Sequence, residues 1–160
     1  MRRSLGMFAV AVMAVAGLWL LPSASAGGGG HGGSDTFRVS VRAVDDEDLN
    51  LGKREFGLGD RFVFTEDLYK NGKKVGSDHG ECVLTRFTRG QGFFQCNVTA
   101  IFHGQGQITV QGVFSFRQDE EQRPFVIGIT GGTGKFRDAG GVVVVDESGK
   151  TSTLTFKLDR

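Results

Sequence analysis

Residues 94–116, FQCNVTAIFHGQGQITVQGVFSF, contain the pattern that decides the fold. Apolar or small residues alternate with polar ones on both sides of the central HGQG segment, residues 103–106. A period of two is typical of a strand with one buried face, and a short break that contains glycine is typical of a hairpin turn. The stretch therefore predicts two antiparallel strands that share one apolar face.

The same alternation recurs along the chain from Thr36 onward, and no segment has the period of an amphipathic helix. Turn sequences such as Lys70–Gly72 and Gly131–Gly134 separate the alternating runs. The runs predict eight strands, near residues 36–43, 61–68, 81–85, 94–102, 107–116, 125–129, 142–145 and 154–158.

Eight strands with a common apolar face can close on themselves, which removes the unpaired edges of an open sheet. We therefore expect an all-β fold, an eight-stranded antiparallel up-and-down β-barrel. A barrel of this size holds either side chains or one small ligand. A sandwich of two sheets is the competing architecture.

The composition agrees with one domain of short strands and tight turns. The chain has 160 residues with 26 Gly and 14 Phe, but only 2 Pro and 2 Cys. These numbers exclude a coiled coil, a collagen repeat and a disulfide-dense small protein. The formal net charge is +1, so there is no basic field to hold a nucleic-acid backbone.

Residues 1–26 have the pattern of a secretory signal peptide. Arg2 and Arg3 precede a 16-residue apolar stretch, Gly6–Leu21, and Ala24–Ala26 is a small-x-small cleavage site. An uncleaved anchor is the alternative, but the stretch is short for a membrane span, which needs about 20 residues. We expect a secreted protein without a stable membrane anchor after cleavage, with a Gly-rich flexible leader at residues 27–34 and a β-barrel domain at residues 35–160.

Motifs for metals, cofactors and thiol catalysis are incomplete. The Gly131–Lys135 segment lacks the first Gly and the final hydroxyl residue of a phosphate-binding loop. Asp46, Asp48 and Asn50 begin like a calcium loop, but its central Gly and closing Glu are missing. Cys82 falls on the apolar phase and His79 in the preceding turn, which does not suit a Cys–His nucleophile. We expect no metal and no cofactor.

Two carboxylates fall on the apolar phase of predicted strands. Glu66 follows Phe62 and Phe64, and Asp45 continues the phase of Val41 and Ala43. Burial in an apolar barrel raises the pKa of a carboxylate, which is how a general acid or base is tuned toward neutral pH. Glu66 and Asp45 are therefore the candidate catalytic residues. The alternative is that both lie solvated at the rim of the barrel.

Cys82 and Cys96 are the only cysteines, in a chain that we expect to leave the cytosol. From composition alone they either pair or remain two small buried thiols.

Several motifs resemble, in the same order, those of plant allene oxide cyclase and the related dirigent proteins. The resemblance extends from about Phe37 to Leu158 and implies an eight-stranded antiparallel barrel, usually trimeric, with an apolar cavity. Its motifs are Phe56–Asp60, Phe64–Thr65, Leu68–Tyr69, Val75–Gly76, Gly80, Cys82, Gly106–Gly112, Ile129–Phe136, Ala139 and Gly141.

The residues that assist the cyclase reaction are not kept. The cyclase pattern has a first-strand Glu, an Asn two residues later and a Pro, where this chain has Ala43, Asp45 and Gly52. Gly140 replaces the Arg of the dirigent pattern. The cavity positions Phe64, Cys82 and Phe94 match, and Phe114 stands where the cyclase has Tyr. The resemblance thus implies a similar container with different chemistry inside.

Cys96 falls where the cyclase pattern has a small residue, on the same hairpin and the same inward phase as Cys82. Antiparallel neighbours on one face come within disulfide reach. We therefore predict a Cys82–Cys96 disulfide.

Three functional hypotheses follow. The first is a secreted isomerase or cyclase of the allene oxide cyclase type, which binds a small apolar or lipid-like molecule and guides its stereoselective cyclisation by conformational steering. Its walls would be Phe62, Phe64, Cys82, Phe94 and Phe114. The second is a non-catalytic extracellular carrier of a hydrophobic ligand. The third is a structural barrel filled solid by phenylalanine.

Apolar outward residues such as Val113 and Val126 agree with the homotrimer that the resemblance implies.

Overall fold

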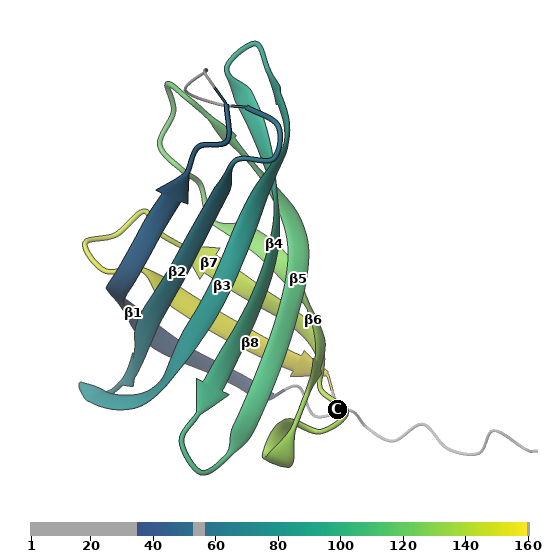
Figure 1. Ribbon diagram of the computed structural model, residues 1–160. Helices are drawn as coiled ribbons and strands as arrows, with labels where there is room; N and C mark the ends of the chain where they lie inside the picture. The colour runs from purple at the N-terminus through teal and green to yellow at the C-terminus, as the bar shows by residue number, and fades with distance from the viewer. Residues whose placement is uncertain (1–34, 53–56, 160) are drawn as a thin grey trace, which may run out of the picture. The chain divides into compact units, whose positions relative to one another are not determined.

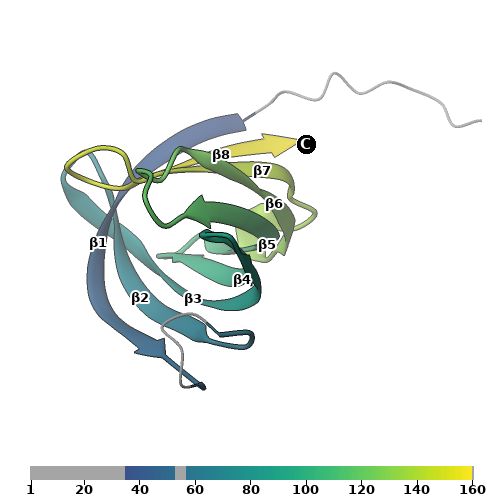
Figure 2. The same cartoon turned by 90° about the horizontal axis from the view of Figure 1, so that it is seen from above.

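The computed structural model describes residues 35–52 and 57–159, which form a closed eight-stranded antiparallel barrel (Figure 1). Each strand pairs with the next, and β8 returns to pair with β1. The strands are β1 (Asp35–Leu49), β2 (Arg61–Lys70), β3 (Lys73–Thr88), β4 (Gln91–Phe102), β5 (Gly106–Arg117), β6 (Phe125–Gly132), β7 (Gly140–Asp146) and β8 (Thr153–Asp159). The predicted barrel is confirmed, and the sandwich alternative is wrong because the ring of strand pairs is closed (Figure 2).

The predicted signal peptide and Gly-rich leader lie outside the described residues. Among the residues that are described, no helix is long and apolar enough to cross a membrane.

Strand β3 is longer than the sequence pattern predicts. It begins at Lys73, directly after a tight turn in which Asn71 and Gly72 both have positive φ, 52° and 74°. The inward positions before Cys82 are Gly76, Asp78 and Gly80. None of them is a large apolar residue, so the alternation of apolar and polar residues does not reveal this part of the strand. Gly80 leaves room for the ring of Phe64, which lies opposite it on β2.

One end of the barrel interior is filled by aromatic rings. Phe37 stacks on Phe156 with ring centroids 4.9 Å apart, and Phe102 packs edge-on against Phe156 at 5.5 Å. The short 3-10 helix η1 (Gly134–Phe136) adds Phe136 to this cluster. Figure 1 shows η1 at the same end as the β2–β3 and β4–β5 turns. These rings pack against one another at this end, where Phe37, Phe102 and Phe136 also border a groove of about 270 Å³.

A β-bulge in β1 changes which residues face inward. Ala43 pairs with Glu66, but the next paired residue, Asp45, lies opposite Thr65. Because directly opposed residues in antiparallel strands share a face, the extra residue Val44 turns Asp45 to the outer face with Thr65. The expectation that Asp45 continues the inward phase is therefore wrong, and Asp45 is exposed. Asp46 takes the position opposite Phe64 instead.

The predicted disulfide between Cys82 and Cys96 is confirmed. The two residues are directly opposed on β3 and β4, with their Cα atoms 4.0 Å apart. Cys82 is 7% exposed and Cys96 is 4% exposed, so the bond is protected from large reductants.

We expect the disulfide to stabilise the fold, because it closes a loop whose ends are 14 residues apart. A Cys82→Ala/Cys96→Ala variant should lose about 2–4 kcal/mol of unfolding free energy in urea denaturation. Adding a small phosphine reductant should lower the midpoint of the native protein and leave that of the double variant unchanged. Equal midpoints for the oxidised and reduced native protein would contradict a stabilising role.

Candidate functional site

A cavity of about 120 Å³ occupies the end of the barrel opposite the aromatic cluster. Its lining includes Phe62 at the start of β2, Phe114 near the end of β5 and Glu147 just after β7. These positions lie at the end of the barrel away from η1 (Figure 1). The interior is therefore plugged at one end and hollow at the other, so the barrel is not filled throughout.

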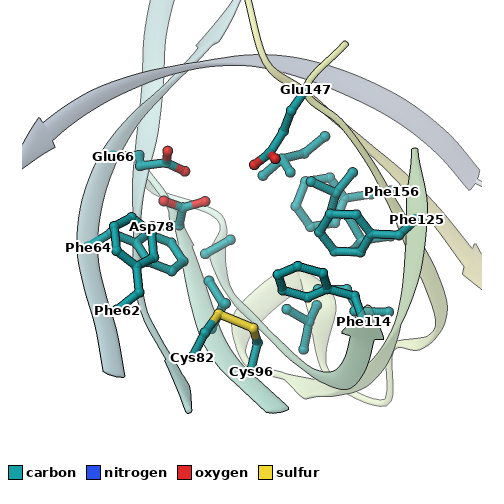
Figure 3. A pocket seen from close by; sticks show the side chains of 17 residues that line it. Phe62, Phe64, Glu66, Asp78, Cys82, Cys96, Phe114, Phe125, Glu147 and Phe156 are labelled. Carbon is teal, nitrogen blue, oxygen red and sulfur yellow. A yellow bond between two sulfur atoms is a disulfide. The ribbon is translucent and has the colours of Figure 1, made fainter. Parts of the chain in front are cut away.

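Phenylalanine side chains form two facing walls of the cavity (Figure 3). Phe62 and Phe64 stack on each other on one side, with centroids 5.4 Å apart. On the other side, Phe114 and Phe125 stack at 4.3 Å, beside Phe156. The Cys82–Cys96 disulfide forms part of the wall between them. Such a space suits a flat apolar molecule.

Three carboxylates face this apolar space: Glu66 on β2, Asp78 on β3 and Glu147 after β7 (Figure 3). Glu66 and Asp78 are directly opposed in the strand register and are joined by a side-chain hydrogen bond. A hydrogen bond between two carboxyl groups requires that one of them carries the proton.

Asp78 is the most deeply buried of these acids, with only 2% of its surface exposed. Its Oδ1 atom has no hydrogen-bond partner. Burial, followed by the charge of Glu66 and the hydrogen bond that the protonated Asp78 donates to Glu66, raises the pKa of Asp78 to about 8. Burial also raises the pKa of Glu66, with smaller contributions from the charges of Glu147 and Asp46. At neutral pH Asp78 is therefore the member of the pair that keeps its proton.

Glu147 lies at the mouth of the cavity and is more exposed. Loss of hydration raises the pKa of Glu147 as well. Among the described residues, those that line the cavity include no Lys, Arg or His. Across residues 35–52 and 57–159, no group of three or more His, Cys, Asp or Glu side chains is placed to hold a metal ion.

Most of the sequence-predicted site residues meet in this cavity, namely Phe62, Phe64, Glu66, Cys82 and Phe114. Phe94 does not line it. Its ring packs against Phe114 at 5.7 Å and Phe116 at 5.3 Å, and with Phe62 it borders a separate groove. Asp45 is outside the cavity because of the bulge in β1.

Sequence reasoning missed Asp78, Glu147 and Phe125. Asp78 could have been found by extending the inward phase of Cys82 back through Gly80. Glu147 lies two residues after the inward Val145 and continues its phase beyond the end of β7. Phe125 begins a run of alternate inward residues, and only its stacking on Phe114 shows that it forms a wall.

A wider groove of about 430 Å³ lies beside the β5–β6 connection. Its lining combines residues of β5 with polar and charged residues of that connection, and includes an exposed ion pair between Arg117 and Glu120 at 3.0 Å. We take the smaller barrel cavity as the candidate functional site because the buried Asp78, two further acids and apolar walls converge there.

Asp60 is a second buried carboxylate, 9% exposed, but its oxygens are used structurally. Oδ1 accepts a hydrogen bond from the Leu51 backbone N–H at 2.9 Å, and Oδ2 accepts one from the Gly57 N–H at 2.6 Å. Asp60 thus ties both ends of the β1–β2 connection together, and it provides a matched comparison for Asp78.

We expect Asp78→Asn to stabilise the protein at neutral pH. An acid whose pKa is raised from 3.8 to about 8 by folding loses stability as the pH rises through this interval. The amide cannot ionise, so the variant should gain about 1–3 kcal/mol of unfolding free energy near pH 8 and little near pH 4. Urea unfolding at the two pH values measures both effects.

Asp60→Asn is the control, and it should destabilise the fold by about 1–3 kcal/mol because an amide nitrogen cannot accept a backbone hydrogen bond. A loss of stability in Asp78→Asn near pH 8 would show that the Asp78 carboxylate is structural, like that of Asp60.

Residues 40–157 match the family described as "Allene oxide cyclase barrel like domain". No curated protein matches the chain. A solved structure of a pyocyanin demethylase is similar, with 26% identity and a TM-score of 0.69, covering 78% of this chain and 99% of that one.

Two further solved structures share the fold. The pterocarpan synthase dirigent protein PsPTS1 is 13% identical, with a TM-score of 0.58, over 79% of this chain and 93% of that one. The Diels-Alderase AbmU from Streptomyces koyangensis is 12% identical, with a TM-score of 0.59, over 81% of this chain and 71% of that one. With the family match over most of its length and the closed barrel, this chain belongs to the allene oxide cyclase barrel-like family.

Proposed function

We propose that this protein is an enzyme that binds a small, largely apolar molecule in the barrel cavity and moves a proton on it with the Glu66–Asp78 pair. The observation that carries the proposal is Asp78, which is almost fully buried, bonded to Glu66 and directed into an apolar space. Such an arrangement lowers stability, and perturbed carboxyl pairs of this kind are typical of catalytic sites.

The pair supplies both an acid and a base near neutral pH. With one shared proton, the protonated carboxyl donates and the ionised carboxylate accepts, so one substrate atom can lose a proton while another gains one. The net result is an isomerisation or a ring closure that needs no cofactor. A pKa of about 8 on Asp78 is close to neutral pH, and general acid–base catalysis is most effective when the pKa of the acid lies near the pH of the reaction.

The walls contribute by confinement. Phe62 and Phe64 face Phe114 and Phe125 across the cavity, so a flexible or reactive molecule is held in one conformation and shielded from water. Membership of the family and the likeness to the pyocyanin demethylase support small-molecule chemistry in such a barrel. The barrels of a dirigent protein and a Diels-Alderase support the same container for cyclisation.

The place and assembly of the protein are part of the proposal. Secretion is supported by the signal-like sequence of residues 1–26 and by the disulfide between Cys82 and Cys96. A homotrimer is supported by outward apolar residues, among which Val113 is 54% exposed and Val126 is 55% exposed.

A non-catalytic carrier is the second candidate function. Its specific support is the apolar walls, which would retain a hydrophobic ligand, including a lipid-like one, without any carboxylate. The carrier and the enzyme differ in whether the ligand leaves the cavity unchanged.

Binding in the cavity can be tested with a glycine substitution. A Cβ atom at Gly80 would overlap the ring of Phe64 and the side chain of Val98, so Gly80→Ala should push these groups into the cavity. We expect about a tenfold or greater loss of ligand retention, measured by native mass spectrometry of protein purified from its secretion medium. Gly140→Ala is the control because nothing lies within 4 Å of its added Cβ. Equal ligand occupancy in both variants would place the ligand elsewhere.

Catalysis can be tested on the ligand identified in this way. Incubation with the native protein should convert it to an isomeric product, followed by liquid chromatography and mass spectrometry. Asp78→Asn and Glu66→Gln should each slow the conversion by about 10²–10⁴-fold, because each removes one partner of the proton exchange. Turnover at the native rate in both variants would contradict a catalytic pair, and recovery of unchanged ligand from the native protein would favour the carrier.

A further inference from the structure

The cavity has a negative charge that nothing in its lining balances. Glu66, Asp78 and Glu147 contribute carboxylates, and the described lining residues include no basic side chain. Asp46 of β1 adds a further negative charge that raises the pKa of Glu66. Even with one proton on the Glu66–Asp78 pair, the interior keeps net negative charge against apolar walls. A buried charge without a partner is costly, so native proteins normally pair it.

Asp78 also lacks a hydrogen-bond partner for one of its two carboxylate oxygens. Only 2% of the residue is exposed, yet its Oδ1 atom accepts no hydrogen bond. A buried acceptor without a donor costs about 1–3 kcal/mol. Figure 3 shows the carboxylates of Asp78 and Glu66 directed into the same space, with the Glu147 carboxylate reaching toward it from the opposite side. A ligand group placed there would meet acceptors from both sides.

From this juxtaposition we infer that the molecule taken by the cavity is a small aromatic cation, with its rings between the phenylalanine walls and its positive centre between the Glu66–Asp78 pair and Glu147. The inference rests on the proposed function and names its substrate class. A protonated aromatic amine and an N-alkylated heteroaromatic ring both have this chemistry.

Both halves of such a ligand have a complement. Flat rings stack between Phe62–Phe64 and Phe114–Phe125, which already use parallel stacking within each wall. A cationic ring gains further attraction from the faces of the phenylalanine rings. The charged centre replaces the missing partner of the carboxylates, and charge-assisted contacts are the stronger class of hydrogen bond and ion pair.

Other occupants fit less well. An anion would be repelled by several carboxylates in a space of low dielectric constant. A neutral aromatic molecule would fill the walls but leave the carboxylates unpaired. A metal ion needs several converging ligands, and the described residues include no such group.

Cation binding must depend on pH through the acids that face the site: Asp46 from β1, Glu66 from β2, Asp78 from β3 and Glu147 after β7. A bound cation favours the ionised form of Asp78 and so releases protons. Affinity for a permanently charged cation should therefore rise as the pH rises through the pKa of Asp78, about 8.

Three probes of nearly equal size separate charge from shape: N-methylquinolinium, its neutral counterpart 1-methylnaphthalene, and the anion 1-naphthoate. Their binding to the full mature protein is measured by equilibrium dialysis. At about pH 9, N-methylquinolinium should bind about tenfold or more tightly than 1-methylnaphthalene, and 1-naphthoate should bind most weakly. Between about pH 6 and pH 9 the affinity for the cation should rise about three- to tenfold, while that for the neutral probe should not rise.

Variants identify the carboxylates responsible. Glu147→Gln should weaken N-methylquinolinium at least about threefold and leave 1-methylnaphthalene unchanged, and Asp78→Asn should remove most of the pH dependence. Glu47→Gln is the matched control, since Glu47 is exposed on β1 opposite Val63 and lines no part of the cavity. Circular dichroism of each variant confirms that the barrel is folded.

The outcomes separate the two proposals. If 1-methylnaphthalene binds as tightly as N-methylquinolinium at both pH values, the inferred cationic substrate is wrong and the proposed small-molecule barrel stands. If none of the three probes binds to the folded native protein, the proposed function itself is overturned. An equal loss of cation binding in Glu47→Gln and Glu147→Gln would show that only the overall charge of the protein matters, which also overturns the inference.

Discussion

The pairing of β1 with β8 is the constraint on which the rest of the structure depends. Asp35–Ser40 pairs with Thr153–Leu158 and closes the sheet into a ring. Once the sheet is closed, every second side chain points into a space with a fixed radius. A side chain on the inward phase fills this space or lines it, unless a bulge in the strand turns it to the outer face. The aromatic cluster at the η1 end, the cavity and the outward position of Asp45 are the three results of that constraint.

The two ends of the interior use the same residue type in opposite ways. At the η1 end, Phe37, Phe102 and Phe156 pack face-to-face and edge-to-face around one another. At the other end, Phe64 and Phe114 lie on opposite walls with space between them. Burial of the first set stabilises the barrel, and the incomplete filling of the second set provides a binding site. One end therefore contributes the stability that allows the other to stay hollow.

The acidic side of the cavity works against stability. Asp78 and Glu66 lie opposite each other on neighbouring strands, where like charges repel, and both lose hydration. One shared proton relieves part of this repulsion, but an unbonded oxygen of Asp78 remains. Asp60 shows that this fold can bury a carboxylate without such a deficit, because two backbone N–H groups bind it. This contrast between the two aspartates supports the proposal that Asp78 has a functional role, whereas Asp60 has a structural one.

The sequence by itself determined the eight strands and most of their inward phase, because alternation with period two depends only on which residues a strand must bury. The pattern left a sandwich as an alternative, and the motifs shared with a known barrel family favoured the barrel. The sequence also placed Glu66 inside and brought Cys82 next to Cys96, since both follow from phase and hairpin pairing. Only the tertiary structure decided that Asp45 turns outward, because a single extra residue in β1 reverses the phase and has no sequence signature. It also decided that Asp78 and Glu66 meet and that one end of the barrel is hollow. Those results depend on register between strands and on the volume left between side chains, which the order of residues along one strand does not specify.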